Sequence, residues 1–296
     1  MTAFTHEFTC SISAPKERLF AALTTESDLR KWFAEYVEID LREGGAFRFW
    51  GKHTLGTPDK DEAMQKIKTL SPPDTLSFAW RLLDRDSAVT WSVFEEKGDD
   101  GSLKTKLKVA HAFDLLPDGA RAKEQIDDLW RLHCGNLGAW VQSGEGMLLP
   151  DFNDPNPQVR QTILINASRE KVFAALTTPE HLKQWFWAPD PQVEARVGGR
   201  YSLGWSYEIG GQKVEGGPTK ILELVPNEKL VTDWPDWRGD ANVPVQKVEW
   251  LLEDAGSGKT KLTLIHSGFT RASDMSDYPF GWIAFAGALR GVAEAL

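Results

Sequence analysis

Two histidines that could do chemistry, His111 and His266, each end a segment of the same pattern, LKVAH at 107–111 and LTLIH at 262–266. In a strand, alternate side chains point to one face, so each imidazole shares its face with two apolar residues before it. We therefore expect both imidazoles to point inward, where they could hold the polar end of a ligand or act as a general base. A purely structural role, hydrogen bonding to backbone between strand and helix, is the alternative.

The other groups that a catalytic site needs do not assemble in this sequence. A base requires a nucleophile, an oxyanion donor or a metal beside it. The six histidines form no His-Glu-x-x-His, His-x-His or Cys/His cluster, and the only cysteines are Cys10 and Cys134. GSGKT at 256–260 fails as a phosphate-binding loop because the first glycine of that motif would stand where the chain has Glu253. We expect no metal, no cofactor and no catalytic residue, and we interpret His133 as a hydrogen-bonded core histidine.

Tryptophan is unusually frequent, with 13 residues against 4 tyrosines. Indole rings bury large areas, and each buried N–H needs a partner, so many of them indicate thick cores or aromatic-lined pockets. Core packing and the lining of a cavity both remain open as explanations. Three pairs occur at similar places in the two halves of the chain: Trp80 and Trp234, Trp91 and Trp250, Trp130 and Trp282.

An internal repeat organises the chain. Residues 14–33, APKERLFAALTTESDLRKWF, align without gaps on 167–186, ASREKVFAALTTPEHLKQWF, and matched residues continue to the last helix. A period of about 153 residues indicates duplicated domains, since solenoid repeats span only ~20–50 residues. We predict one domain at 1–145, a linker rich in Gly, Pro, Asn and Asp at 146–157, and a second domain at 158–296.

Each copy predicts the same order of elements. A strand opens it, at 6–13 or 158–165, and two short helices follow, the second beginning at Thr25 or Thr178. Antiparallel strands come next, and a long helix with one apolar face closes the copy. The pattern predicts an α+β fold in which a curved sheet holds the terminal helix. In the first copy the strands are predicted at 44–50, 63–70, 76–83, 89–95 and 103–110.

Composition and charge exclude several classes of protein. The net charge of −9, from 34 basic and 43 acidic residues, gives no basic field for nucleic acid or an anionic membrane. No signal peptide and no apolar run of about 18 residues is present, so we expect a cytoplasmic protein without membrane insertion.

The motifs FAALTT…LxxWF, the Gly-Gly hairpin, the T-K-L-x-x-x-H strand and the last tryptophan-bearing helix resemble the START-like (SRPBCC) helix-grip superfamily. More narrowly, the chain resembles the AHSA1 family, the homologues of the Hsp90 ATPase activator, and most closely its bacterial stand-alone members. The resemblance implies an apolar cavity between sheet and helix, used for lipids, hormones or polyketides. The N-x-N-N-W-H-W motif of the chaperone activator is absent, so we expect no effect on an Hsp90 ATPase.

The predicted function is binding of an apolar or amphipathic small molecule between the sheet and the terminal helix of one or both domains. Two alternatives stay open. One is an interaction module that regulates a chaperone or another protein, and the other is a cyclase or hydratase that uses His111 or His266 as acid and base. The predicted cavity residues are Trp80, Trp91, Leu107, Val109, His111, Trp130 and Leu137 in the first copy, and Trp234, Trp250, Leu262, Leu264, His266, Trp282, Phe285 and Leu289 in the second.

Overall fold

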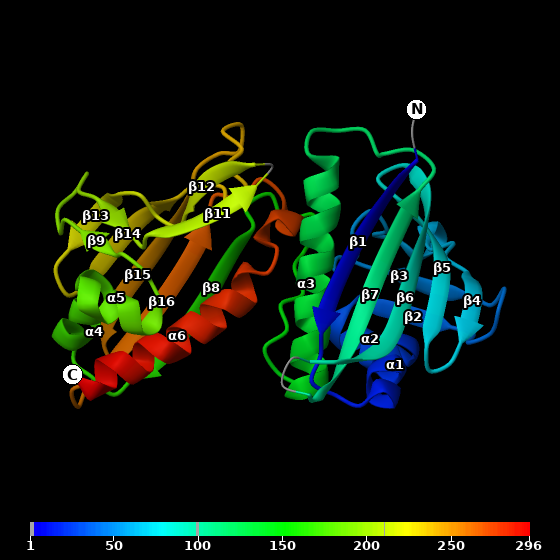
Figure 1. Cartoon of the computed structure of the whole chain (residues 1–296), viewed down its shortest axis with the longest axis horizontal. Helices are drawn as coiled ribbons and strands as arrows, with labels where there is room; N and C mark the ends of the chain where they lie inside the picture. The colour runs from blue at the N-terminus through cyan, green and yellow to red at the C-terminus, as the bar shows by residue number, and fades with distance from the viewer. Residues whose placement is uncertain (1–2, 99–100, 210) are drawn as a thin grey trace. The chain divides into compact units, whose positions relative to one another are not determined.

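The computed structural model describes residues 3–98, 101–209 and 211–296, and the chain forms two compact units. The first unit ends at Asp154 and also includes Arg271–Asp277, whereas the second comprises Pro155–Thr270 and Tyr278–Leu296. Each unit is built around one copy of the repeat (Figure 1). The α+β fold with two helix-grip domains is confirmed. Their boundaries at 145 and 158 stay a prediction.

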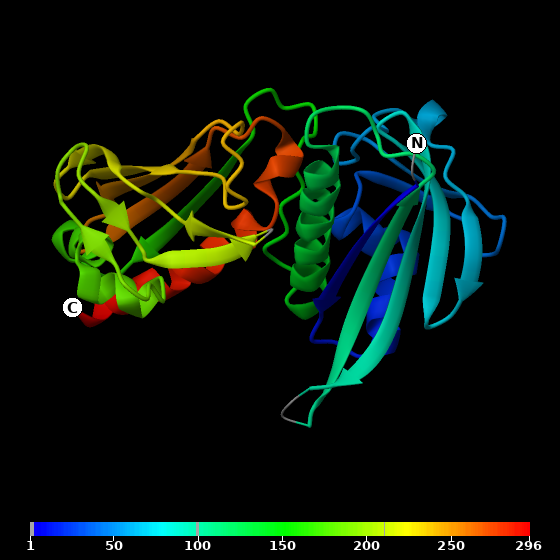
Figure 2. The ribbon, with the colours of Figure 1, turned by 45° about the horizontal axis from the view of Figure 1, so that its top comes forward.

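The first unit is a five-stranded antiparallel sheet, in the order β1-β7-β6-β5-β4, with the long helix α3 packed against it. Two short helices follow the first strand, and the short strands β2 and β3 pair separately. β6 and β7 are the longest strands, and their hairpin extends beyond the rest of the sheet (Figure 2). The elements are β1 Phe4–Ser11, α1 Lys16–Thr24, α2 Glu26–Trp32, β2 Tyr36–Ile39, β3 Phe47–Trp50, η1 Lys60–Glu62, β4 Ile67–Ser71, β5 Thr75–Leu82, β6 Arg85–Lys97, β7 Leu103–Phe113 and α3 Ala122–Gln142.

The second unit repeats this architecture, with strand order β13-β14-β15-β16-β8 and α6 as the terminal helix. It differs from the first by a separate hairpin, β11–β12, placed where the first copy has turns and η1. The elements are β8 Gln158–Ile165, α4 Arg169–Thr177, α5 Pro179–Trp185, β9 Gln192–Val193, β10 Tyr201–Ser202, β11 Trp205–Ile209, β12 Gln212–Gly216, β13 Ile221–Val225, β14 Lys229–Trp234, β15 Gln246–Asp254, β16 Thr260–Ser267, η2 Ala272–Met275 and α6 Tyr278–Ala295.

Alternation along β7 explains how the sheet holds its core. Leu107, Val109 and His111 are buried on one face, while the residues between them are only half-buried. On α3 the buried residues recur at helical spacing, so their stripe covers the inward face of the sheet. The inward orientation predicted for His111, and by the same pattern for His266, is therefore confirmed, since both side chains are fully buried.

Several local predictions need correction. β3 begins at Phe47 rather than at 44, and β4 begins at Ile67 rather than at 63. β6 begins at Arg85 rather than at 89, because Leu83 and Asp84 both adopt the left-handed region and join β5 to β6 in a two-residue turn. Asp84 is compatible with such a turn, but Leu83 is not a usual residue there, so strand pairing imposes the turn on it. Thr25 and Thr178 do occupy the N-cap positions of α2 and α5, but neither makes a side-chain capping hydrogen bond.

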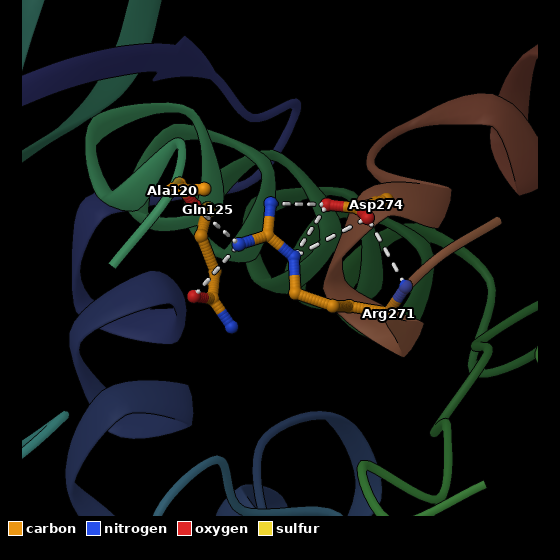
Figure 3. A network of polar contacts seen from close by, with 4 residues as sticks. All are labelled: Ala120, Gln125, Arg271 and Asp274. Atoms are coloured by element: carbon orange, nitrogen blue, oxygen red, sulfur yellow. Dashed lines mark hydrogen bonds and ion pairs between the residues drawn. The ribbon is translucent and has the colours of Figure 1, made fainter. Parts of the chain in front are cut away.

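Residues Arg271–Asp277, from the second copy of the repeat, are part of the first unit. Arg271 pairs with Asp274 at 2.7 Å, and its Nη1 donates to Oε1 of Gln125 at 3.1 Å and to the carbonyl oxygen of Ala120 at 3.4 Å (Figure 3). Arg131 of α3 also pairs with Asp277 at 3.4 Å. The hydrogen bond from Arg271 to Gln125 and the ion pair between Arg131 and Asp277 join this segment to α3, a contact that no local sequence pattern indicates.

Among the described residues, no helix is long and apolar enough to span a membrane. The same residues contain no group of three or more His, Cys, Asp or Glu side chains that could hold a metal ion.

Candidate functional site

His111 lies at the centre of the first unit and uses both ring nitrogens. Trp130 Nε1–H donates to its Nδ1 at 3.1 Å, and Ser87 Oγ lies 2.8 Å from its Nε2. Ser87 in turn donates to the carbonyl oxygen of Trp80, whose ring stacks on the imidazole with centroids 5.4 Å apart. Because an indole N–H can only donate, Nδ1 is the acceptor, and the proton of the neutral ring is on Nε2.

His266 has the same arrangement in the second unit, with one substitution. Trp282 Nε1–H donates to its Nδ1 at 3.1 Å, but the partner of Nε2 is Oε1 of Gln246, at 2.9 Å. Ser87 and Gln246 occupy equivalent positions, since Ser87 pairs with Trp80 across its sheet and Gln246 pairs with Trp234. The two copies therefore keep the Trp–His hydrogen bond and differ in the third member.

Burial sets the charge of these histidines. It lowers the pKa of His111 to about 3, with His6 as a smaller cause, and that of His266 to about 3. Both rings are neutral at pH 7, and neither has a free nitrogen. A ligand or a substrate proton can reach either imidazole only by replacing one of these hydrogen bonds.

The predicted cavity residues are brought together in each unit, and all except Phe285 are buried. In the first unit those other than His111 belong to one apolar cluster that includes Phe33, and His111 stacks on Trp80. Three surface pockets of about 500, 390 and 520 Å³ lie on the first unit, and none of these three is lined by a predicted cavity residue. The role of the predicted cavity residues as the lining of a ligand site stays a prediction.

The interpretation of His133 as a hydrogen-bonded core histidine needs correction, because it is a core residue whose Nδ1 is unpaired among the residues that the structure describes. It is buried against the rings of Phe33 and Trp130, and its Nδ1 has no hydrogen-bond partner in the described structure. Burial lowers its pKa to about 3. The indole nitrogens of Trp80 and Trp91 also lack partners among the described residues. Buried polar atoms without a partner in the described structure therefore lie within the aromatic core of the first unit itself.

The second unit carries an open group of rings that we call the aromatic face: Trp187, Trp205, Tyr207 and Phe285. The rings of Trp187 and Trp205 lie 5.6 and 5.8 Å from that of Phe285 on α6. Tyr207 stands two residues after Trp205 on β11, where side chains share a side of the strand. Tyr207 and Trp187 are 44% and 62% exposed, so this face is open to solvent.

The aromatic face continues into the interior of the second unit. Phe285 lies 4.8 Å from Phe186, which lies 6.2 Å from Trp282, the partner of His266. Trp205 also lies 6.5 Å from the predicted cavity residue Trp234. An unbroken series of rings therefore connects solvent with the buried histidine.

Trp187 adopts an unusual backbone conformation, with φ at 50°. A non-glycine residue there costs ~1–3 kcal/mol, and such strain often accompanies a functional site. The strain places the most exposed large ring of this face next to Phe285. The counterpart of Trp187 in the first copy is Ala34, which is fully buried.

The corresponding side of the first unit is covered by residues 147–152, which we call the strap. The buried amide of Asn136 donates to the carbonyl oxygen of Leu148 and accepts from its N–H, both at 2.7 Å. Phe152 N–H donates to the carbonyl oxygen of Lys52 at 2.9 Å, and the side chains of Met147 and Phe152 pack against the core. The first unit is thus closed where the second is open.

Comparison with protein families assigns the chain. The family model described as "Activator of Hsp90 ATPase homolog 1-like protein" matches residues 13–142 and again 166–294. The chain belongs to this family. The two matches coincide with the two copies of the repeat, so the resemblance expected from the motifs is confirmed.

Solved structures resemble the chain at low sequence identity. DynU16, a protein of the dynemicin biosynthetic locus, is 18% identical, with 98% of both chains covered and a TM-score of 0.39. CalU16 from Micromonospora echinospora is 24% identical over 48% of this chain and 78% of that one, with a TM-score of 0.37. An Hsp90 activator from Plasmodium falciparum is 22% identical over 38% and 74%, with a TM-score of 0.31. Among curated proteins, no match is found.

Sequence reasoning missed most of the aromatic face because it selected tryptophans that occur in both copies. Trp187 and Trp205 have no aromatic counterpart, since Ala34 and Gly51 occupy their positions in the first copy. The useful signal was therefore the difference between the two family domains. The contact between Cys10 on β1 and Cys134 on α3 was also missed. Their thiols share a hydrogen bond that lowers the pKa of Cys10 and raises that of Cys134.

Proposed function

We propose that the second domain binds an apolar, ring-bearing small molecule on its aromatic face. The observation that carries this proposal is the exposed group of rings on β11, α6 and the segment after α5, which leads inward to Trp282 and His266. Large exposed apolar patches on globular domains commonly mark binding sites. The family includes binders of small ligands, which is consistent with this activity.

The chemistry of the face favours a flat apolar body with one polar end. Phe285 and Trp205 present rings for stacking, and aromatic pairs contribute ~0.5–1.5 kcal/mol each beyond the area that they bury. Tyr207 adds a hydroxyl to the indole N–H groups of the face, and burial raises its pKa, so the hydroxyl stays protonated and can donate a hydrogen bond. Deeper entry would bring the ligand to Trp234 and Trp282, which belong to the cavity predicted from the sequence.

An apolar fluorescent probe, anilinonaphthalene sulfonate, tests the proposal on the full chain. Phe285→Ala and Trp187→Ala each remove one ring contact, and we expect the Kd of the probe to rise by about tenfold, which corresponds to ~1.4 kcal/mol. Trp50→Ala is the matched control, because Trp50 stacks on the exposed Tyr36 at 5.5 Å in the first unit. A probe that binds wild type and both variants equally, or that responds only to Trp50→Ala, refutes the site.

A further inference from the structure

The strap of the first unit shows how an extended peptide lies on this side of the fold. Residues 145–150 have no regular secondary structure. The strap is held through its backbone: Leu148 bonds twice to Asn136, the carbonyl oxygen of Pro150 lies 2.8 Å from Nδ1 of His53, and Phe152 N–H donates to Lys52. Two of its apolar side chains, Met147 and Phe152, pack against the core. Recognition therefore combines backbone hydrogen bonds with two apolar anchors.

The anchoring positions of the strap correspond to the aromatic face of the second unit. Trp130 and Trp282 make the same bond to histidine, and this pair places Asn136 at the position of Ala288, one turn after Phe285. Ala46 and Arg200 make the same isolated bridge, to Lys66 and Lys220 respectively. The bridge places Lys52 and His53 at the positions of Ser206 and Tyr207 on β11. The surface that the strap covers in one unit is thus the uncovered one in the other.

β11 supplies the backbone groups that such a peptide needs. In the described residues it pairs with β12 alone, so its other edge has no strand partner. An unpaired edge presents N–H and C=O groups that an extended peptide can bond, while pockets on the same surface take alternate side chains. In the first unit the matching segment already makes such a bond, from Phe152 N–H to Lys52.

We propose that the aromatic face and the free edge of β11 bind an extended peptide segment of a partner protein, in the position that the strap holds in the first unit. The segment would carry two apolar anchors, one of them aromatic, about five residues apart, as Met147 and Phe152 are. This inference goes beyond the proposed function, because the occupant is a peptide rather than a small molecule. It uses the same aromatic face but does not require that a small molecule binds there. The strap shows, within this chain, the backbone hydrogen bonds and apolar contacts that such a peptide would make.

A synthetic peptide with the strap sequence, EGMLLPDFND (residues 145–154), is the probe, labelled at its N-terminus and titrated against the full chain by fluorescence anisotropy. We expect saturable binding that weakens about tenfold in Phe285→Ala and not in the control Trp50→Ala. Phe285→His, which introduces the residue of the first copy, serves as a second variant if the alanine variant folds poorly. A peptide with serine in place of Met147 and Phe152 should not bind.

Each outcome decides between occupants of the surface. No saturable binding up to about 1 mM, where the binding free energy is only ~4 kcal/mol, overturns the proposal. Peptide binding that is unchanged in Phe285→Ala but tighter in Asn136→Ala would place the peptide on the first unit, because Asn136→Ala releases the strap. This outcome also overturns the proposal. Binding of the fluorescent probe without peptide binding leaves the small-molecule site alone standing. Peptide binding without probe binding leaves the peptide site and removes the other.

Discussion

Trp282 donates its indole N–H to Nδ1 of His266 over 3.1 Å, and both side chains are buried in the core of the second domain. Because the indole cannot accept a hydrogen bond, this contact leaves the proton on Nε2, which Gln246 accepts at 2.9 Å. The same bond between Trp130 and His111, also 3.1 Å, gives the first domain the same neutral tautomer. Duplication has preserved a structural hydrogen bond while the surfaces around it diverged.

Removal of Gln246, the third member of the hydrogen-bonded group Trp282–His266–Gln246, should destabilise the second domain. Gln246→Leu leaves the buried Nε2–H of His266 without an acceptor, which costs ~1–3 kcal/mol in the free energy of unfolding. His266→Phe alone leaves the Trp282 indole N–H without its acceptor and Oε1 of Gln246 without its donor. The double variant Gln246→Leu, His266→Phe leaves only the indole N–H unpaired, so we expect it to lose less stability than the sum of the two single losses. Urea unfolding measures the two single variants and the double variant. A double variant that only adds a second independent loss would contradict the coupling.

Acid should weaken the protein through its buried histidines. His111, His133 and His266 have pKa values of about 3 in the folded protein against an ordinary pKa of 6.5, so the unfolded chain binds more protons between these values. Their contribution is complete above pH 6.5 and is lost as the pH falls toward 3. Between pH 7 and pH 5 each histidine should remove about 2 kcal/mol from the free energy of unfolding.

Urea titrations at several pH values test this dependence. Two of the three histidines lie in the first domain, so its transition should shift about twice as far as that of the second. Equal shifts of both transitions, or none between pH 7 and pH 5, would contradict the assignment.

His133→Phe should stabilise the first domain. Phenylalanine already stands at the equivalent position, Phe285, and the substitution removes a buried Nδ1 that has no partner among the described residues. We expect a gain of about 1–3 kcal/mol at pH 7. The pH-dependent shift of the first domain's transition should also fall by about half, because one of its two buried histidines is removed. Thermal and urea unfolding at pH 7 and pH 5 measure both effects, and a loss of stability with unchanged pH dependence would argue that Nδ1 has a partner in solution.

Asn136→Ala should release the strap. The amide makes two hydrogen bonds of 2.7 Å with the backbone of Leu148, and alanine can supply neither. We expect faster limited proteolysis within 145–154, measured by mass spectrometry of the fragments. Gly138→Ala, on the same helix with open space around its added Cβ, is the control and should leave the cleavage rate unchanged. Equal cleavage of both variants would show that the strap does not depend on Asn136.

Gly216→Ala should weaken probe binding on the aromatic face. A Cβ at Gly216 would lie 2.2 Å from the ring of Tyr207, so the ring must move away. The displacement disturbs β11, and we expect the Kd of the probe to rise several-fold while the far-UV spectrum stays the same. Unchanged probe affinity would remove Tyr207 and β11 from the site.

The sequence by itself determined the repeat, the order of elements and the inward direction of the two histidines. These features follow from local periodicity, because alternation along 107–111 or 262–266 already selects a face of the strand. The start of β6 was less well predicted, since the turn before it places Leu83 in the left-handed region, which a leucine does not favour.

Only the tertiary structure decided which atoms meet. The hydrogen-bond partners of His111 come from α3 and β6. The strap covers one side of the first domain through its bonds to Asn136, whereas Trp187 is exposed on the corresponding side of the second domain. Each depends on side chains far apart in the chain, and on whether packing leaves a polar atom such as Nδ1 of His133 without a partner among the described residues. Local pattern carries no information about such contacts, because they are set by how the elements pack and not by the order in which they occur.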